Sequence, residues 1–451
     1  MAVGISVSFV PPSGTRSQAG PASRPNILIF LTDDQREGLQ VMDAVRNQLA
    51  NKGRVYPNAF VTTPACCPSR ATIMTGRYAH NHRVATNLQA RKLAHNTTLQ
   101  FYLQRAGYRT GYIGKFLNGW KLNQGPPFFH EWAINAPDRM ERKLRYYDGP
   151  VNVNGAIKPL PRNEYSTTFF GKKAGDFIRR WNRTNDKKPW LLFVAPNAPH
   201  PPLIPERKYE NSPVRGWNGN AGTKESDKSD KPRYVRRLDH TFKKGQKTRR
   251  EQYRMLKSVD DMTQRVMKAL RRTKEARDTL IVFISDNGYS WGEHGLIGKF
   301  LPYTEAVQVP MIFTWPRRID PGSRDARLVG NIDVTPTVLD AVGITPDGPE
   351  MDGRSLLDQS WDRPRLLFEY KRHNYAEAPD WASTRTKTYQ YIEYYNGDEV
   401  VFKEYYDLTQ DPHQLNNVLG DDDLLNDPPT LPAIAFQLNQ DRECQGADTC
   451  P

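Results

Sequence analysis

Short apolar runs that break into polar clusters recur along the chain. The clearest of these runs consist mainly of Ile, Leu, Val, Phe or Trp residues and are followed within a few positions by Asp, Asn or His. Runs of this kind are typical of strands that are buried on both faces of a sheet. We therefore predict that they form one mostly parallel sheet. The clearest runs are residues 26–31, 190–194 and 279–284, and weaker ones are residues 109–113 and 311–314.

The segments between these runs carry apolar residues at three- and four-residue spacing, which is typical of helices with one buried face. Strand and helix thus alternate, and this order predicts an α/β fold with a large, mostly parallel or mixed sheet flanked by helices on both faces. Ligands of such folds bind beyond the carboxyl ends of the strands, where the polar clusters fall. The expected helices are residues 98–106, 167–181, 252–271 and 335–342.

The pattern changes after residue 357 to shorter β-like segments at 366–370, 388–394 and 400–406, with a hairpin turn expected at 396–398. We predict a catalytic domain over residues 25–357 and a smaller antiparallel α+β domain over residues 358–451. Residues 1–24 are rich in Pro, Ser and Gly around one apolar stretch. We interpret them as a disordered leader or the remnant of an export signal.

The chain of 451 residues has a net charge of +14, which predicts attraction to polyanions. It has no basic helix with base-reading residues and no zinc-finger spacing, so an anionic carbohydrate fits the charge as well as nucleic acid does, and the charge itself does not choose between them. The partner that we expect is a sulfated carbohydrate and no nucleic acid. No run of 18 apolar residues occurs, so no transmembrane helix is expected. Residues 206–250 hold 14 Lys and Arg against 6 Asp and Glu. They are either a solvated insertion or a lid that holds a polyanionic chain over the site.

The chain has four cysteines, of which Cys66 and Cys67 are adjacent and Cys444 and Cys450 flank a short polar loop. The last two could close a small disulfide ring that pins the C-terminus, or remain free thiols on a loose tail. A disulfide would favour an oxidising compartment. We therefore expect a secreted or periplasmic protein.

Acidic and amide side chains follow two of the predicted strands: Asp33 and Asp34 after the first, and Asp286 and Asn287 after residues 279–284. Packing several carboxylates at the ends of apolar strands is costly unless a cation neutralises them. All of these groups are oxygen donors, which suits a hard cation such as Ca²⁺ or Mg²⁺ better than zinc.

The segment Cys66-Cys67-Pro68-Ser69-Arg70 combines a nucleophile with the start of a helix. Pro68 suits the first helical turn, and residues 69–77 are predicted to be helical. Cys66 would then lie at a helix N-terminus, where free N–H groups and the helix dipole favour a bound anion. Arg70, about one turn further on, can point back to the same place.

This segment resembles the signature of type I sulfatases, whose fold is alkaline-phosphatase-like. The resemblance implies that Cys66 is oxidised by a formylglycine-generating enzyme to formylglycine. One hydroxyl of the aldehyde hydrate then attacks sulfur, and the other later expels the sulfate. It also implies a calcium ion held by Asp33, Asp34, Asp286, Asn287 and residue 66. Further matching segments are 114–115, 198–200, 285–288, 298–299, 406–408 and 411–412.

The resemblance also implies roles for the basic residues. Arg70 would steady the hydrate, Lys115 and Lys299 would bind sulfate, and His200 with Lys299 would protonate the departing alcohol. The chain looks most similar to the N-acetylglucosamine-6-sulfatase branch, which acts on heparan or keratan sulfate. The Cys-Cys form of the motif, residues 78–82, residues 114–118 and the terminal cysteine pair carry that narrower resemblance.

One position departs from the family pattern. Many sulfatases carry a histidine two places after the lysine equivalent to Lys115, but this chain has Leu117 there, followed by Asn118. Asn118 can hydrogen-bond but is no base, so His80 or His82 could replace the missing histidine if the fold brings one of them near. We expect Asn118 and His82 to contact the substrate.

Two alternative functions remain open on the sequence. Sulfate and phosphate monoesters differ mainly in charge, so a phosphate or phosphonate monoester hydrolase of the same superfamily is the first alternative. The second is a non-catalytic protein that binds heparin-like polyanions, as the basic surplus suggests.

Overall fold

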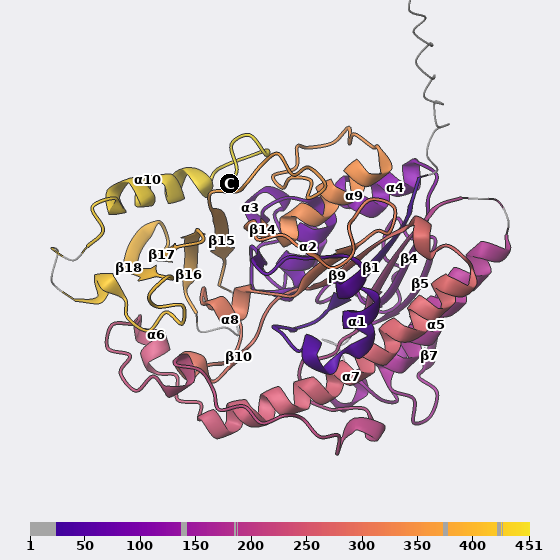
Figure 1. The fold of residues 1–451 in the computed structure, drawn as a ribbon, viewed down its shortest axis with the longest axis horizontal. Coiled ribbons are helices and arrows are strands. Elements are labelled where there is room, and N and C mark those ends of the chain that lie inside the picture. Colours follow the sequence, from indigo (N-terminus) through magenta and orange to yellow (C-terminus); the bar gives the residue numbers. More distant parts are fainter. Residues whose placement is uncertain are drawn as a thin grey trace, which may run out of the picture.

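A ten-stranded mixed sheet crosses the larger part of the molecule (Figure 1). The computed structural model describes residues 24–136, 142–184, 186, 188–372, 378–421, 425 and 427–451, so the leader expected at residues 1–24 lies almost wholly outside the described residues. In spatial order the strands are β13 (Ser323–Arg324), β2 (Arg54–Val55), β12 (Met311–Thr314), β9 (Thr279–Ser285), β1 (Asn26–Thr32), β8 (Trp190–Ala195), β4 (Arg109–Lys115), β5 (Glu131–Asn135), β6 (Pro150–Val153) and β7 (Ala156–Pro159).

The centre of this sheet is parallel, as the continuous apolar runs predict. Strand β1 pairs in parallel with β8 on one side and β9 on the other, and β8 pairs in parallel with β4. Antiparallel pairs occur toward the edges, where β12 meets β9 and β2, and where β6 meets β5 and β7. The prediction of a mostly parallel or mixed sheet is therefore confirmed.

Alternate residues of the central strands face two separate apolar layers. Ile27 and Ile29 of β1 join a cluster that includes side chains of α2, α4 and α9, whereas Leu28 and Phe30 join a cluster with α1, α5 and α7. Helices thus cover both faces of the sheet (Figure 1). The helices are α1 (Asp43–Gln48), α2 (Cys66–Thr75), α3 (Ala79–His82), α4 (Leu99–Arg105), α5 (Ser166–Arg183), α6 (Arg233–Arg236), α7 (Phe242–Arg272), α8 (Thr304–Val307), α9 (Val334–Val342) and α10 (Leu431–Asp441).

A second, four-stranded antiparallel sheet forms near the C-terminus, with α10 packed against it (Figure 1). Its last two strands form the hairpin expected around Gly397, which has the positive φ of 64° that such a turn favours. This sheet confirms the predicted antiparallel C-terminal part. In spatial order its strands are β15 (Leu366–Tyr370), β16 (Asp380–Arg385), β17 (Tyr389–Asn396) and β18 (Glu399–Asp407).

Some elements differ from the sequence-based expectations. Strand β16 was not predicted, because its polar residues obscure the alternation of buried positions. Strands β5, β6 and β7 were not predicted either. Helix α7 begins at Phe242 rather than at residue 252, so the end of the basic segment 206–250 is helical. Two further pairs of short strands are β10 (Ser290–Trp291) with β11 (Ile297–Gly298), and β3 (Ala59–Phe60) with β14 (Val329–Gly330).

Within the described residues, no helix combines the length and apolar character that a membrane span requires.

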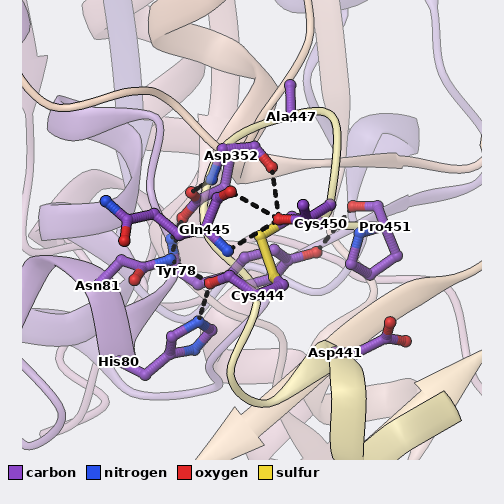
Figure 2. Close-up of a disulfide and its surroundings, with 12 residues drawn as sticks. Tyr78, His80, Asn81, Asp352, Asp441, Cys444, Gln445, Ala447, Cys450 and Pro451 are labelled. Carbon is purple, nitrogen blue, oxygen red and sulfur yellow. Dashed lines mark hydrogen bonds between the residues drawn. A yellow bond between two sulfur atoms is a disulfide. The ribbon is translucent and has the colours of Figure 1, made fainter.

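The C-terminus is closed by a disulfide between Cys444 and Cys450 (Figure 2). The ring that it forms lies against α3, where the carbonyl of Cys444 accepts hydrogen bonds from Asn81 Nδ2 at 2.9 Å and lies 2.9 Å from His80 Nε2. The hydroxyl of Tyr78 donates to the last carbonyl, that of Pro451, at 3.1 Å. Of the two alternatives for these cysteines, the structure thus has the disulfide ring, which docks the chain end near the helix that follows α2.

The disulfide should contribute measurably to stability. Replacing Cys444 and Cys450 together by serine removes a cross-link between residues six positions apart, which is expected to lower the free energy of unfolding by about 2 kcal/mol. Urea unfolding of the double variant and of the wild type under oxidising conditions measures this. In reducing buffer the two proteins should become equally stable. Equal stability in both buffers would show that the ring contributes nothing.

Candidate active site

Cys66 is the first residue of α2 and is almost fully buried. The preceding Ala65 is extended and offers no side-chain cap, and instead Asn87 Oδ1 accepts a hydrogen bond from Cys67 N at 2.9 Å. The helix ends at Gly76, whose left-handed φ of 67° suits a glycine cap. The helix predicted for residues 69–77 therefore starts three residues earlier, and Cys66 lies at its N-terminus as expected.

The acidic clusters of β1 and β9 meet because the two strands run in parallel and in register. Thr32 is paired with Ser285, so the residues that follow them lie side by side. The backbone N–H of Asp34 donates to Asp286 Oδ1 at 3.2 Å, and Asn287 Nδ2 donates to Asp34 Oδ1 at 2.6 Å. Asp34 itself has a left-handed φ of 68°. Backbone strain of this kind persists where the surroundings hold it, and it concentrates at functional sites.

Two lysines contact these carboxylates. Lys115 Nζ lies 2.6 Å from Asp33 Oδ2, and Lys299 Nζ lies 2.5 Å from Asp34 Oδ1 and 2.7 Å from Cys66 Sγ. Lys115 reaches this place because β4 continues through Gly114, where the backbone has a φ of 105° and a Cβ would lie 1.9 Å from the carbonyl oxygen of Ala195. Only glycine fits there.

Arg70 is fully buried one helical turn after Cys66. Its Nε donates to Asp286 Oδ2 at 2.8 Å, its Nη1 donates to the carbonyl of Lys115 at 2.5 Å, and its Nη2 lies 3.7 Å from Asp33 Oδ2. Arg70 therefore links α2 to β4 and to the residues after β1 and β9. The expectation that it points back toward the N-terminus of α2 agrees with this geometry.

His200 presents one ring nitrogen to the acids. Its Nδ1 lies 2.5 Å from the carbonyl oxygen of Pro201, and since that oxygen only accepts hydrogen bonds, Nδ1 carries a hydrogen. Its Nε2 lies 3.8 Å from Asp34 Oδ2. Arg145 Nη1 also donates to the carbonyl of Pro201, at 2.9 Å, and so helps to hold the loop that carries His200.

Burial and neighbouring charges shift the acid–base behaviour of the cluster. Burial raises the pKa of Asp286 to about 6, with the charge of Asp33 adding to the effect and Arg70 opposing it. Burial alone would also raise the pKa of Asp33, but Lys115, His200, Arg70 and Lys299 hold it well below its usual value.

The thiol of Cys66 is not prepared for nucleophilic attack. Burial raises its pKa well above the ordinary value, and the charge of Asp33 adds to the effect, against Lys115 and Lys299. Burial thus favours the thiol over the thiolate, and the thiol is the poorer nucleophile of the two.

The cluster fits a hard divalent cation. One potential ligand atom each from Asp33, Asp34, Cys66 and His200 lies within 4.8 Å of the others. Asp34 Oδ2 is buried and has no hydrogen-bond partner in the described part of the chain, so it is available as a ligand. The carboxylates of Asp33 and Asp34, with the oxygens of Asp286 and Asn287 beside them, are ligands that suit calcium or magnesium, whereas the sulfur of Cys66 and the imidazole of His200 are softer donors. His200, expected to be catalytic, joins the group, while Asp286 and Asn287, expected as ligands, adjoin it through their hydrogen bonds with Asp34.

A cavity of about 650 Å³ opens above Cys66, within the size range of ligand-binding sites. Of the predicted residues, Cys66, Asn118, His200 and Lys299 line it, whereas Asp33, Asp34, Arg70, Lys115, Asp286 and Asn287 lie buried around the base of Cys66. Its other walls were not predicted. They come from Asn87, Leu88, Ala90, Arg91, Gly119, Arg145 and Phe300.

The two other candidate histidines lie away from this cavity. His82 is buried, its Nε2 lies 3.0 Å from Thr72 Oγ1, and burial lowers its pKa to about 3. His80 pairs with Glu369 at 3.0 Å. Neither lines the cavity. The expectation that His82 contacts substrate is therefore not supported, because its ring packs inside the protein behind α2.

The basic segment 206–250 also lies away from the cavity, since none of its residues lines it. Within it, the buried Lys231 pairs with Asp230 at 2.9 Å and donates to the carbonyl of Leu415 at 2.6 Å. Most of its other lysines and arginines are exposed. Of the two interpretations, this placement agrees with a largely solvated insertion and gives no support to a lid.

Comparisons with known proteins agree with the geometry. Residues 25–344 match the family model described as "Sulfatase", and residues 292–431 match the model described as "N-sulphoglucosamine sulphohydrolase, C-terminal". The chain is 28% identical to the N-acetylglucosamine-6-sulfatase of Homo sapiens over 97% of this chain and 88% of that protein.

Solved structures share the fold. One is described as a complex with its substrate D-glucosamine-2-N,6-O-disulfate; it has a TM-score of 0.77 and 22% identity, over 93% of this chain and 98% of that chain. Another is a phosphonate monoester hydrolase of Agrobacterium radiobacter, with a TM-score of 0.72 and 22% identity, over 93% of this chain and 96% of that chain. At these identities the likeness shows the fold alone.

The ion pair between Arg70 and Asp286 should be essential to stability. Arg70→Met leaves a buried carboxylate without its guanidinium partner and should lower the free energy of unfolding by about 3–5 kcal/mol. Urea unfolding in EDTA measures this without a contribution from divalent ions. Arg46→Met removes an exposed arginine paired with Asp43 and should cost no more than about 1 kcal/mol. Equal losses in the two variants would contradict the prediction.

Proposed function

This chain belongs to the sulfatase family and is a sulfuric ester hydrolase, and we propose that it removes sulfate from a sulfated carbohydrate with a formylglycine at position 66 and a calcium ion. The observation that carries the proposal is the position of Cys66. It starts a helix at the base of the cavity, with Lys299 Nζ 2.7 Å and Asp33 Oδ1 3.4 Å from its sulfur. An anionic ester and a cation can both reach this atom.

Modification of Cys66 accounts for the chemistry better than a thiol does. Burial raises the pKa of the Cys66 thiol and so disfavours the thiolate, whereas the hydrate of formylglycine would supply a hydroxyl nucleophile and a second hydroxyl that later releases the sulfate. The partner implied is a formylglycine-generating enzyme that recognises the segment around Cys66. The positive end of the helix dipole at the start of α2 favours a bound sulfate next to this residue.

The calcium ion, with magnesium as the alternative, would be held by Asp33, Asp34, Asp286, Asn287 and residue 66. When bound, it would polarise a sulfate oxygen and acidify the hydrate. The buried oxygen of Asp34 that has no hydrogen-bond partner among the described residues supports this assignment.

The basic residues would bind the sulfate, hold the site in position and protonate the leaving group. Lys115 and Lys299 bind the sulfate oxygens, and Arg70 holds Asp286 and the start of α2 in position. His200, with Lys299, gives a proton to the departing alcohol through Nε2, because Nδ1 is committed to the carbonyl of Pro201.

His200 is also our candidate for the base that releases sulfate. Leu117 occupies the place of the usual histidine, and His200 is the one imidazole that lines the cavity in the described part of the chain. Once it has protonated the alcohol it is neutral, and Nε2 can accept a proton from the hydrate in the next step. A single group would then serve first as acid and afterwards as base. Asn118, which lines the same cavity, would hydrogen-bond the substrate.

The proposed substrate is an N-acetylglucosamine-6-sulfate unit of a glycosaminoglycan. Support comes from the near-full-length similarity to an N-acetylglucosamine-6-sulfatase. A phosphate or phosphonate monoester hydrolase remains the second candidate, because a phosphonate monoester hydrolase shares the fold. The disulfide supports a secreted or periplasmic location.

Modification of Cys66 should determine activity. The chain co-produced with a formylglycine-generating enzyme should carry the aldehyde in the Cys66 peptide by mass spectrometry and cleave an aryl sulfate faster than the matched aryl phosphate. Cys66→Ala should lower kcat/KM by more than about 10³-fold, as loss of a nucleophile does. Cys67→Ala, which removes the neighbouring thiol, should remain active. Full activity with an unmodified thiol, or faster phosphate cleavage, would overturn the proposal.

Calcium should stabilise the folded protein. At a free Ca²⁺ concentration of about 100 times Kd, the gain in the free energy of unfolding should be about 2.7 kcal/mol, visible as a rise in Tm. Asp34→Asn should abolish most of this gain, whereas Asp43→Asn, an exposed acid on α1, should keep it. Parallel titrations with Mg²⁺ identify the preferred ion. If neither ion raises the Tm of the wild type, the metal assignment fails.

A further inference from the structure

We propose that the outer part of the Cys66 cavity is a second anion-binding subsite, built by Arg91 and Arg145, for a second negatively charged group on the sugar that carries the scissile sulfate. The inference rests on the proposed function, whose substrate it narrows. It would make the preferred substrate a sugar with two acidic groups, such as a sulfate ester together with an N-sulfate, rather than a sugar with the ester alone.

The first step is the charge balance at the base of the cavity. Three buried carboxylates there, those of Asp33, Asp34 and Asp286, are paired with three buried cations, those of Lys115, Lys299 and Arg70. A divalent cation would add two positive charges, whereas a sulfate monoester brings one negative charge. The reacting end thus already has enough positive charge for the scissile group, and further cations in the walls are not needed for it.

Arg91 is the clearest surplus cation. It lies in a short turn, residues Ala90–Lys92, lines the cavity and is exposed. Its guanidinium makes no hydrogen bond or ion pair with any residue in the described part of the chain. A guanidinium offers a planar fork of donors that matches the oxygens of a sulfate or a carboxylate. No acidic side chain among the described residues lines this cavity, so nothing there competes for Arg91.

Arg145 brings a second guanidinium to the same cavity, next to His200. Its Nη1 lies 3.4 Å from His200 Nδ1 and donates to the carbonyl of Pro201 at 2.9 Å, which fixes the side chain in place. Its Nε is buried and has no partner among the described residues. No acidic side chain among the described residues pairs with Arg145, which lies next to the group that would protonate the departing alcohol.

The wall between these charges suits a sugar ring. Leu88, which is 59% exposed, and Phe300 line the same cavity and offer apolar surface, while Asn118 offers an amide. A pyranose presents C–H groups on its faces and hydroxyls at its edge, so it can contact both kinds of surface. An anionic substituent on that ring then lies within the cavity that Arg91 and Arg145 line.

Binding can be tested apart from catalysis with the full chain carrying Cys66→Ala. Calorimetry would compare N-acetylglucosamine-6-sulfate, with one charged group, and glucosamine-N,6-disulfate, with two. We expect the disulfate to bind at least about fivefold more tightly at low salt, with the preference shrinking as ionic strength rises. Arg91→Gln should remove most of this preference and Arg91→Lys should keep part of it. Lys92→Gln removes the same charge from the next residue of the same turn, outside the cavity, and should leave the preference unchanged.

Turnover by the enzyme that carries formylglycine at position 66 provides a second test of the subsite. The ratio of kcat/KM for the disulfate to that for the monosulfate should exceed about fivefold in the wild type and fall toward one in Arg91→Gln, with a further loss in the Arg91→Gln, Arg145→Gln double variant. An unchanged ratio in Arg91→Gln, or an equal change in Lys92→Gln, would overturn the second subsite. If the modified wild type cleaves neither sugar, the proposed function fails, and the calorimetric preference still decides whether the two arginines bind a second anion.

Discussion

The buried charge cluster where the carboxyl ends of β1 and β9 meet α2 is the constraint on which the rest of the structure depends. Three carboxylates without access to bulk water are tolerable only because cations reach them from three directions. Lys115 arrives from β4, Lys299 from the loop after β11, and Arg70 from α2. Each of these partners requires a particular backbone path. The cluster therefore ties the order of the central strands to the position of the helix that begins with Cys66.

Much of this arrangement could be predicted from the sequence, because the informative residues lie at the ends of regular elements. The apolar runs of β1, β8 and β9 mark buried strands, and parallel strands bring their carboxyl ends to one edge. Asp33, Asp34, Asp286 and Asn287 were expected together for that reason, and the register that pairs Thr32 with Ser285 brings them into contact. The start of α2 was also predictable, since a proline followed by helix-forming residues indicates a helix N-terminus.

The remaining parts of the cavity could not be predicted, because irregular segments supply them. Arg91 and Arg145 lie in short 3₁₀ turns, and nothing in the polar sequence around them distinguishes a cavity wall from a solvated surface. His82 illustrates the opposite error. It was expected to contact the substrate and was one of two candidates to replace the histidine missing at Leu117, but the helical turn that carries it directs the ring toward Thr72. The sequence alone did not show which side of that short helix His82 faces.

The C-terminal sheet contributes to the site through the residue that follows Lys299. Phe300 has a left-handed φ of 84°, a conformation that a bulky side chain adopts only at a cost of about 1–3 kcal/mol. Trp381 of β16 donates its indole N–H to the carbonyl of Phe300 at 2.9 Å, and Tyr370 of β15 stacks on Trp381 at 5.8 Å between ring centroids. The small sheet thereby holds the strained backbone that aims Lys299 at Asp34 and Cys66. Because Cys66 comes from α2 beside the large sheet and Lys299, which contacts it, is held by the small sheet, the two parts must fold together for the cavity to exist.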